Sequence, residues 1–470
     1  MRRAIATKTL AVVVIAVVVV AGIAAYLFIP QGTGPSTSQD ITLRVATRHD
    51  TTITDYALQL FLQSSIAKQY RITNIIFVSV QPSLWVDTIR GAQAKGTPFD
   101  VAWGGGPTLF DDSYADGLLA PINKTETLQT ISQIADSIGG APLKRLHNGQ
   151  IYWVAAAISS FGFIVNKDVL NSYQLPMPQL WEDLAGVDFA KKLPTSTVGF
   201  ATTASSTSHT RIYEIILEKF GWDTGWSVLA RLAANGKPYG GSVEALTGVQ
   251  SGEVPVGIAI DFYGYSSELQ FPNTKYVLPF NESIINGDPI ALLASSAHPD
   301  AAQAFIQWVL SVDGQKVWLN RDISRLPVVP SVFNTPEGQA RADLYADYNA
   351  TINNIGIPFD DAKVLSYEYS MKVYFDAVFS DVHDSLVQAW MKLVNDYLAG
   401  KITQAQFQNY AYQLGSPLTW TSGGQTYTFT LAYAQSINDA LKSTATASQY
   451  AQLWRNAARD HYQNIIQSLP

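Results

Sequence analysis

The chain has 470 residues, of which 47% are hydrophobic and 15% charged, and this balance predicts a globular protein of two or three domains and excludes a disordered one. The formal net charge of −7, with no block of lysine or arginine in the body, argues against nucleic acid as a partner. The absence of cysteine excludes disulfides, thiolate metal sites, cysteine nucleophiles and a lipid-modified N-terminal cysteine.

The N-terminal residues predict export of the body. Residues 1–9 carry three positive charges and read as a cytoplasmic basic flank, and residues 10–29 are apolar and uncharged. At ~1.5 Å per residue that run spans a ~30 Å hydrocarbon layer, so we expect a transmembrane anchor or a signal segment. Residues 30–40 are rich in Gly, Pro, Ser and Thr and predict a flexible linker. The body would then lie on the extracellular face of the cell membrane, or be secreted if the segment is cleaved.

The first part of the body alternates between strand and helix patterns. Residues 41–47, 74–80 and 99–105 predict strands, and residues 55–70 and 84–96 predict the helices between them. This order is typical of a parallel sheet with helices on both faces. Ligands of such sheets bind beyond the carboxyl ends of the strands.

A second α/β unit is expected from about residue 158. Residues 160–170 predict a strand, a turn and a helix, residues 210–222 an amphipathic helix, and residues 254–266 a strand that runs into aromatic residues. Residues 288–311 predict a strand, a turn and a helix that return to the first unit.

The last part of the chain is predicted to be mainly helical. Residues 363–398 and 447–469 have helical patterns, and residues 420–430 read as a β-hairpin or an ordered turn. No repeat of constant period is present.

Several stretches occur together in an order that resembles the extracellular solute-binding proteins of ABC importers, family 1, near the iron(III)/phosphonate-type branch. They are "DVAWGGGPTLFDDSYADGLLAPI", "GFIVNKDVL", "SSTSHTRIYEIILEKFGW", "PVGIAIDFYGYS" and "INGDPIALLASSAHPDAAQAFIQWVLSVDGQKVWLN". The resemblance covers roughly residues 41–400. The length, apolar segment and linker are similar to those of an archaeal, membrane-anchored form.

The resemblance implies an α/β fold of the periplasmic-binding-protein type II, in which two lobes close on a ligand. Each lobe would hold a mixed, mainly parallel sheet flanked by helices. Lobe 1 would comprise residues 41–157 and 288–325, lobe 2 residues 158–287, and residues 326–470 a helical part packed on the lobes. The chain would cross between the lobes near residues 158–161 and 288–291.

Two stretches of lobe 1 are expected to face the ligand. The first contains His49, Asp50 and Thr51, where free N–H groups of the following helix would meet a polar or anionic ligand. Asp50 or Thr51 could equally cap that helix. In the second, Trp103 would offer a stacking face, and Gly105 and Gly106 would let the backbone approach the ligand or make a tight turn.

Lobe 2 and the connecting segments are expected to supply the other contacts. A run of hydroxyl residues opens the helix led by Arg211, and it either binds the ligand or is a solvated loop with a helix cap. The candidate residues here and at the strand end and crossings are Ser205, Ser206, Thr207, Asp261, Tyr263, Tyr265, Ser159, Ser160 and Asp288.

Ferric ion is one alternative cargo that the resemblance implies. Iron-binding relatives use two adjacent tyrosines as phenolates with a histidine, which would here be Tyr263, Tyr265 and His49. Gly264 separates the two tyrosines, and few anionic oxygens accompany them, whereas hard Fe(III) prefers several.

The predicted protein is a monomeric binding protein without a cofactor or resident metal. Its partners would be a small-molecule solute, an ABC permease with its ATPase, and the membrane through the N-terminal helix. No G-x-S-x-G or H-E-x-x-H motif is present, so a surface hydrolase is a weaker alternative, as is an adhesive surface protein. Three N-x-S/T sequons are candidate glycosylation sites in an exported body: Asn123, Asn281 and Asn349.

Overall fold

Two β-sheets organise the chain in the computed structural model, which describes residues 40–138, 140–354 and 356–470. Residues Ile41–Pro470 form one compact unit. The predicted basic flank and membrane segment, and the linker up to residue 39, lie outside the described residues. Among the described helices, none has the length and apolar character needed to cross a bilayer.

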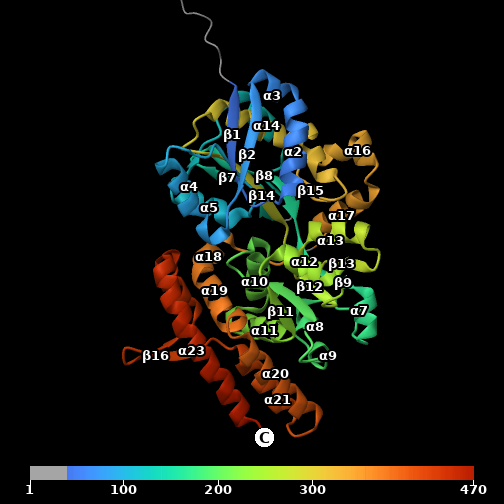
Figure 1. Ribbon diagram of the computed structural model, residues 1–470, viewed down its shortest axis with the longest axis vertical. Coiled ribbons are helices and arrows are strands. Elements are labelled where there is room, and N and C mark those ends of the chain that lie inside the picture. The colour runs from blue at the N-terminus through green and yellow to red at the C-terminus, as the bar shows by residue number, and fades with distance from the viewer. Residues whose placement is uncertain (1–39, 139, 355) are drawn as a thin grey trace, which may run out of the picture. The chain divides into compact units, whose positions relative to one another are not determined.

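The first domain is built on an eight-stranded sheet, drawn in the upper half of Figure 1. Its first strand, β1, lies parallel to both β2 and β3, as the β-α-β pattern predicted, whereas β14 runs antiparallel to β3 and to β8. The sheet is therefore mixed. Its strands are β1 (Ile41–Thr47), β2 (Ile72–Ser79), β3 (Val101–Trp103), β4 (Leu119–Ala120), β7 (Lys144–His147), β8 (Gln150–Ser159), β14 (Asn286–Leu293) and β15 (Leu326–Pro327).

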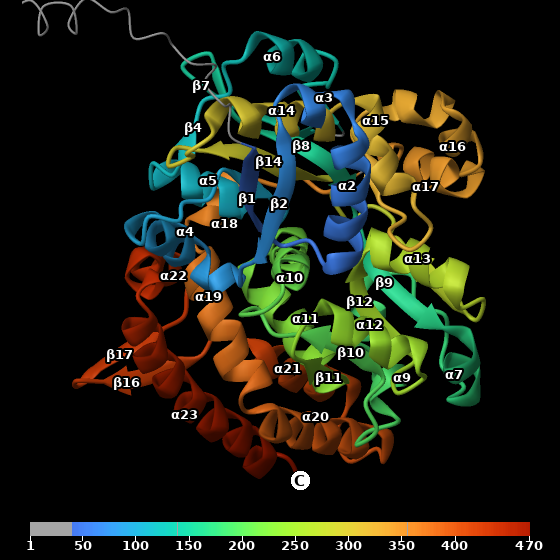
Figure 2. The same ribbon diagram turned by 45° about the horizontal axis from the view of Figure 1, so that its top comes forward.

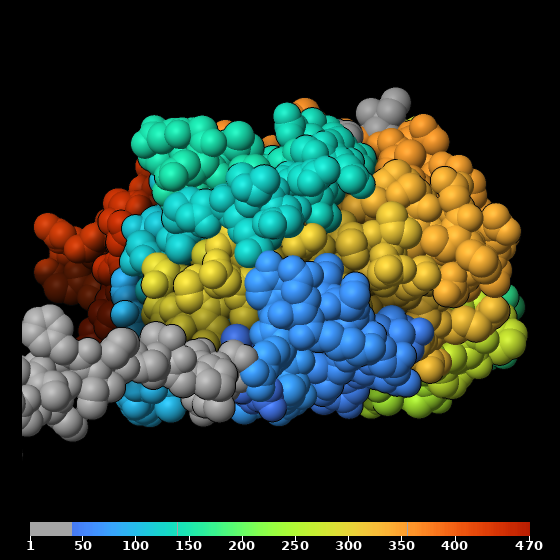
Figure 3. All heavy atoms as spheres, turned by 90° about the horizontal axis from the view of Figure 1, so that it is seen from above, coloured from blue at the N-terminus to red at the C-terminus, as the bar shows by residue number. Residues whose placement is uncertain are grey.

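Helices cover both faces of this sheet because side chains alternate along each strand. Leu43 and Val45 of β1 join the core beneath α2 and α14, and Ala46 joins the separate core beneath α4 and α5. Figure 3 shows atoms from around residue 300 lying between those of the N-terminal helices and those from around residue 130. The helices of this domain are α2 (Thr51–Gln63), α3 (Ser65–Gln69), α4 (Trp85–Ala94), α5 (Pro107–Ala115), α6 (Thr125–Ile131), α14 (Pro299–Val309), α15 (Val312–Gln315), α16 (Pro336–Gln339) and α17 (Ala342–Ile352).

The helix predicted over residues 55–70 is two helices in the structure. It begins earlier than predicted, at Thr51, because the carboxylate of Asp50 accepts a hydrogen bond from the backbone N–H of Ile53 and caps α2. It breaks at Ser64, whose hydroxyl accepts from the N–H of Ala67 and starts α3.

The second domain is built on a five-stranded sheet with the order β11-β10-β12-β9-β13. The chain leaves the first sheet after Ser159 and enters the second at Phe161. The strands are β9 (Phe161–Asn166), β10 (Val198–Ala201), β11 (Gly236–Tyr239), β12 (Val256–Ile260) and β13 (Thr274–Val277), and the helices are α7 (Lys167–Ser172), α8 (Trp181–Leu184), α9 (Val187–Ala190), α10 (Thr207–Phe220), α11 (Trp222–Ala234), α12 (Ser242–Gln250) and α13 (Asp261–Gln270).

The strand predicted over residues 254–266 is shorter than expected, because it ends at Ile260 and a helix follows at once. The change of backbone matters for Tyr263 and Tyr265. A strand would place residues two apart on one face, whereas a helix places them about 200° apart. The two tyrosines therefore point in different directions.

The C-terminal part of the chain packs on the second domain and shares its hydrophobic core (Figure 2). Tyr374 stacks on Phe429 at 3.7 Å between ring centroids, and Trp226 and Trp454 meet Tyr374 edge-on at 4.9 and 5.3 Å. The predicted hairpin is present. The elements are α18 (Asp361–Leu365), α19 (Glu368–Phe375), a π-helical turn (Asp376–Ser380), α20 (His383–Leu398), α21 (Gln404–Gly415), β16 (Thr419–Ser422), β17 (Gln425–Thr428), α22 (Leu431–Ile437) and α23 (Thr444–Ser468).

The C-terminal part also contacts the first domain at one carboxylate. Asp112 of α5 accepts a hydrogen bond from the hydroxyl of Tyr369, and it forms an ion pair with Lys442 at 2.8 Å. Asp112 is buried. The C-terminal helices thus contact both domains, although their main core lies with the second.

Candidate functional site

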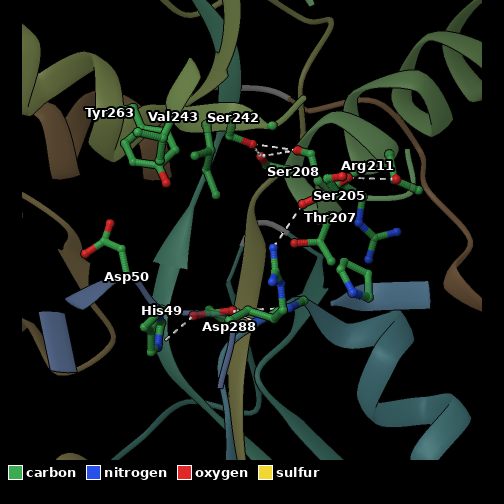
Figure 4. Close-up of a pocket in the computed structure, with 18 of the residues that line it drawn as sticks. His49, Asp50, Ser205, Thr207, Ser208, Arg211, Ser242, Val243, Tyr263 and Asp288 are labelled. Atoms are coloured by element: carbon green, nitrogen blue, oxygen red, sulfur yellow. Dashed lines mark hydrogen bonds and ion pairs between the residues drawn. The ribbon is translucent and has the colours of Figure 1, made fainter. Parts of the chain in front are cut away.

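A cavity of about 400 Å³ lies between the two sheets. Connections that follow strand ends line it from both domains, namely those after β1, β3, β10, β11 and β12, and α19 adds a further wall. Figure 4 shows the hydroxyl residues of the second domain facing His49, Asp50 and Asp288 across this space. The structure therefore brings together most of the segments predicted to face a ligand.

The wall after β1 includes the residues predicted there, except Thr51. His49 and Asp50 line the cavity, whereas Thr51 is exposed and lies outside the lining. Asp50 also caps α2, so the predicted cap is present and is compatible with a position in the cavity lining. Arg48, which directly precedes His49, lines the cavity as well.

Arg48 is a cation without a carboxylate partner. Its Nη1 donates to the carbonyl of Val80 at 2.9 Å, and its Nη2 donates across the cavity to the carbonyl of Ser205 at 3.0 Å. No ion pair includes it in the described part of the chain, and burial lowers its pKa. Carbonyl oxygens neutralise a guanidinium less than a carboxylate does, so Arg48 can still attract an anion.

His49 is held in a fixed, neutral state. Its ring packs edge-on against Trp103 at 4.6 Å, and its Nε2 lies 3.6 Å from Asp288. Burial lowers the pKa of His49 to about 3, despite the opposing effect of Asp288. The imidazole is therefore uncharged at neutral pH.

Asp288 organises the glycine loop after β3. Its Oδ1 accepts hydrogen bonds from the N–H groups of Gly105 at 2.9 Å and Gly106 at 3.2 Å, and its Oδ2 lies 2.9 Å from Arg325. Gly105 and Gly106 line the cavity with φ values of 122° and 88° that favour glycine. Their N–H groups bond Asp288, so the predicted loop is present but its donors are already used.

Two predicted residues lie in the core instead of facing the cavity. Trp103 is fully buried and packs against His49, Phe305 and Trp318, so the expected stacking face is corrected to a support for His49. Ser159 is also fully buried, and its hydroxyl accepts a hydrogen bond from Arg325 at 3.3 Å.

The second domain contributes a cluster of hydroxyl groups at two helix N-termini. Ser206 caps α10 and lies 2.6 Å from the hydroxyl of Ser242, the first residue of α12. The hydroxyl of Ser208 lies 2.9 Å from the hydroxyl of Ser242. Ser205 and Thr207 line the cavity beside them, so all three predicted hydroxyl residues are in place. Free N–H groups and the helix dipole make such termini favourable for anions.

Ser160 and Asp261, both predicted to contact the ligand, bond each other at the first crossing between domains. The N–H and the hydroxyl of Ser160 donate to the carboxylate of Asp261 at 2.6 and 3.1 Å. Both residues are buried, and neither lines this cavity. They act as a structural pair at the crossing.

Asp261 is expected to make stability fall as pH rises. Burial raises its pKa to about 7, against the hydrogen bonds from Ser160 and Phe262 that lower it. An unfolded Asp titrates near ~3.9, so between these values the folded state holds the extra proton. This contribution is full below about pH 4 and is lost as pH rises through the folded pKa. Urea unfolding of the wild type and of Asp261→Asn across this window checks it; parallel pH profiles for the two proteins would contradict it.

Tyr263 and Tyr265 have separate surroundings, as the helix at this position requires. Tyr263 is half-buried and lines the cavity, and burial together with the charge of Asp50 raises its pKa. Tyr265 is buried, lies outside the lining, and its hydroxyl is 3.3 Å from that of Thr351. The predicted iron set is thus not assembled, and Tyr263 is disfavoured as a phenolate. No group of three His, Asp or Glu residues suited to a metal ion occurs among the described residues.

A further wall of the cavity was not anticipated. It consists of Arg211 and Glu214 from α10 and Glu368 and Lys372 from α19. The i, i+4 spacing of Glu368 and Lys372 was the only sign of this pair in the sequence. Nothing in the sequence placed them beside α10. Asn286 lines the cavity too, and its side-chain oxygen accepts a hydrogen bond from Nε of Arg211 at 3.1 Å.

The three sequons differ in exposure. Asn123 and Thr125 are both exposed, whereas Ser283 and Thr351, the hydroxyl residues of the sequons at Asn281 and Asn349, are each 1% exposed.

Two curated relatives match parts of the chain. The phosphoglycerate transport regulatory protein PgtC of Salmonella typhimurium is 27% identical over 241 residues, which are 51% of this chain and 57% of that protein. The Fe(3+)-binding periplasmic protein of Serratia marcescens is 26% identical over 174 residues, which are 35% of this chain and 48% of that protein. The chain therefore spans about half the length of the curated relatives it matches.

Solved structures confirm the predicted two-domain α/β fold. The periplasmic binding protein AfuA of Actinobacillus pleuropneumoniae, solved with exogenous fructose-6-phosphate, has a TM-score of 0.53 and 18% identity and covers 66% of this chain and 98% of its own. The ferric binding protein of Campylobacter jejuni has a TM-score of 0.53 and 15% identity and covers 73% and 99%. At these identities the likeness shows the fold alone.

The family model described as bacterial extracellular solute-binding protein matches residues 66–346, and this region contains the strands and helices that form most of the cavity. The match extends over more than half of the chain. The chain therefore belongs to the bacterial extracellular solute-binding protein family.

Proposed function

We propose that the protein is the substrate-binding component of an ABC importer and that it holds a small organic anion, such as a phosphorylated compound, between its two domains. The observation that supports this most directly is the position of Arg48. This cation bonds the carbonyl of Ser205, has no carboxylate partner among the described residues, and lies beside the hydroxyl cluster at the start of α10 and α12. Anions gain most where a guanidinium and helix N-termini converge.

The two carboxylates in the sequence-predicted part of the lining, Asp50 and Asp288, are both engaged, which favours an anion over a metal ion there. Asp50 is engaged in capping α2, and Asp288 is engaged by Arg325 and two backbone N–H groups. These contacts already compensate the negative charge of Asp50 and Asp288, whereas Arg48 could compensate the negative charge of a phosphate. Binding would favour the closed arrangement of the domains, because Arg48 and the hydroxyl cluster come from different domains.

The finer parts of the proposal follow from the sequence. We expect a monomer of the archaeal, anchored type, fixed on the outer face of the membrane by residues 10–29 and delivering its solute to a permease. Residues 41–157 with 288–325 and residues 158–287 are the proposed lobes. Glycosylation is proposed at Asn123, where the asparagine and the threonine of the sequon are both exposed.

Thermal unfolding of the purified full-length chain tests the binding function. Inorganic phosphate, glycerol 3-phosphate and small dicarboxylates are added singly, with ferric citrate and neutral sugars as comparison compounds. An anion present at 100 times its Kd should stabilise the protein by about 2.7 kcal/mol. Neutral sugars should give no shift. A shift with ferric citrate alone, or silence across all anions, would refute the proposal.

A further inference from the structure

The C-terminal segment contributes to the cavity beyond the region matched to the family. The match ends at residue 346, and α19 begins at Glu368. Glu368 and Lys372 line the cavity opposite Arg211 and Glu214 of α10. All four side chains are nearly inaccessible, with exposures of 9% or less. Arg48 lines the same cavity but is not one of these four residues.

Each carboxylate of this wall uses one oxygen in an ion pair and leaves the other without a partner. Lys372 lies 3.1 Å from Oε1 of Glu368, and Nη1 of Arg211 lies 3.2 Å from Oε2 of Glu214. Arg211 uses three of its five N–H groups in this way, because Nη2 also bonds Asp361 at 2.7 Å and Nε bonds Asn286. Oε2 of Glu368 and Oε1 of Glu214 are buried and have no hydrogen-bond partner among the described residues.

Unpartnered buried carboxylate oxygens are rare, because each gives up hydration without a replacement. Here both belong to residues that line a ligand cavity. Burial and the charge of Glu368 raise the pKa of Glu214 well above its usual range. Since Arg211 and Lys372 already balance much of the charge, a neutral hydroxyl donor fits this wall better than an ammonium group.

The segment is fixed to the anion-binding side of the cavity as well. Asp376, one turn beyond Lys372, accepts hydrogen bonds from the N–H and hydroxyl of Thr203 at 3.0 and 2.7 Å and from the N–H of Ala204 at 3.2 Å. The loop that presents Ser205 therefore rests on the same segment that carries Glu368. These hydrogen bonds hold the loop that carries Ser205 at a fixed distance from the segment that carries Glu368.

We propose that Glu368 and Glu214 form a second subsite that accepts hydrogen bonds from hydroxyl groups of the solute. The solute is then a hydroxylated organic anion, with its charged group at Arg48 and its hydroxyl-bearing body at α19. This inference rests on the proposed function and adds the substrate class. It also assigns a specificity role to a segment outside the family match.

Glycerol 3-phosphate and propyl phosphate form a matched pair of ligands, and the difference in their affinities measures the contribution of the hydroxyl groups. Kd is measured by calorimetry on the full-length chain for inorganic phosphate, glycerol 3-phosphate and propyl phosphate, which lacks the two hydroxyls. The wild type should bind glycerol 3-phosphate at least tenfold more tightly than propyl phosphate. Glu368→Gln should reduce this preference to threefold or less while changing the Kd for inorganic phosphate by less than twofold.

The variants distinguish a recognition role from a folding defect. Glu214→Gln is the second test, because it alters the facing residue without touching α19. Glu218→Gln is the control: Glu218 lies one turn further along α10, pairs with Lys363 at 2.8 Å and does not line the cavity. It should keep the full preference for glycerol 3-phosphate.

Failure of the second subsite and failure of the proposed function give different results in these experiments. If inorganic phosphate binds but the wild type does not prefer glycerol 3-phosphate, or if both glutamine variants keep the preference, the second subsite is refuted and the anion site stands. If none of the three phosphates binds, the proposed function itself fails, and the inference fails with it.

Discussion

Replacement of Arg48 by methionine is expected to weaken the binding of inorganic phosphate by about 30- to 100-fold. A hydrogen bond to a charged group contributes about 1.5–3 kcal/mol, which corresponds to roughly 10- to 150-fold in Kd. Among the described residues Arg48 bonds carbonyl oxygens and forms no ion pair with a carboxylate, so its removal affects mainly the binding of the ligand. Methionine preserves much of the side-chain volume. Calorimetric titration of the full-length variant measures the effect.

The control for this experiment is Arg44→Met, in the strand β1 that precedes Arg48. Arg44 lies over the ring of Phe99 at 5.3 Å and is not part of the cavity lining. It should leave the affinity within twofold of the wild type. Arg48→Lys should give an intermediate loss, because lysine keeps the charge but not the planar fork of donors. An Arg48→Met protein that binds phosphate as tightly as the wild type would contradict the anion site.

Truncation of Trp454 to alanine should destabilise the protein by about 3–5 kcal/mol. Trp454 is fully buried and meets Phe429 at 5.2 Å and Tyr374 at 5.3 Å between ring centroids. Tyr374 belongs to α19, so the cavity left by the indole lies directly behind the wall that carries Glu368. Urea unfolding followed by circular dichroism gives the free energy.

Trp454→Phe is the matched variant. The indole Nε1 of Trp454 is buried without a hydrogen-bond partner in the described part of the chain, so phenylalanine removes no bond and fills much of the space. Trp454→Phe should lower the free energy of unfolding clearly less than Trp454→Ala does. Equal losses for the two variants would show that the aromatic cluster does not hold the C-terminal helices in place.

The sequence was sufficient for the alternation of strands and helices at the start of the body and for part of the cavity lining. Strand ends marked by His49 and Asp50, and the hydroxyl run around Ser206, were recognisable because local sequence determines helix caps and strand ends. The C-terminal hairpin was recognisable from its paired glycines.

The remaining site residues depended on information that the local sequence does not contain. Tyr265 was misplaced because a helix, not a strand, continues from Ile260, and short apolar stretches do not distinguish the two. Trp103 was misplaced because its environment comes from Phe305 and Trp318, some 200 residues later. The contribution of Glu368 required knowing that α19 packs beside α10, a contact across some 150 residues of sequence.

The contacts of Tyr369 and Lys442 with Asp112 affect how easily the two domains can separate. The C-terminal helices share a core with the second domain, so the two domains cannot part without separating Asp112 from Tyr369 and Lys442. Lys442 is partly accessible to water, and dissolved ions screen such a pair. Added salt should therefore weaken the ion pair between Asp112 and Lys442 and ease the separation of the two domains. In the proposed importer, release of the solute should then become faster as the salt concentration rises.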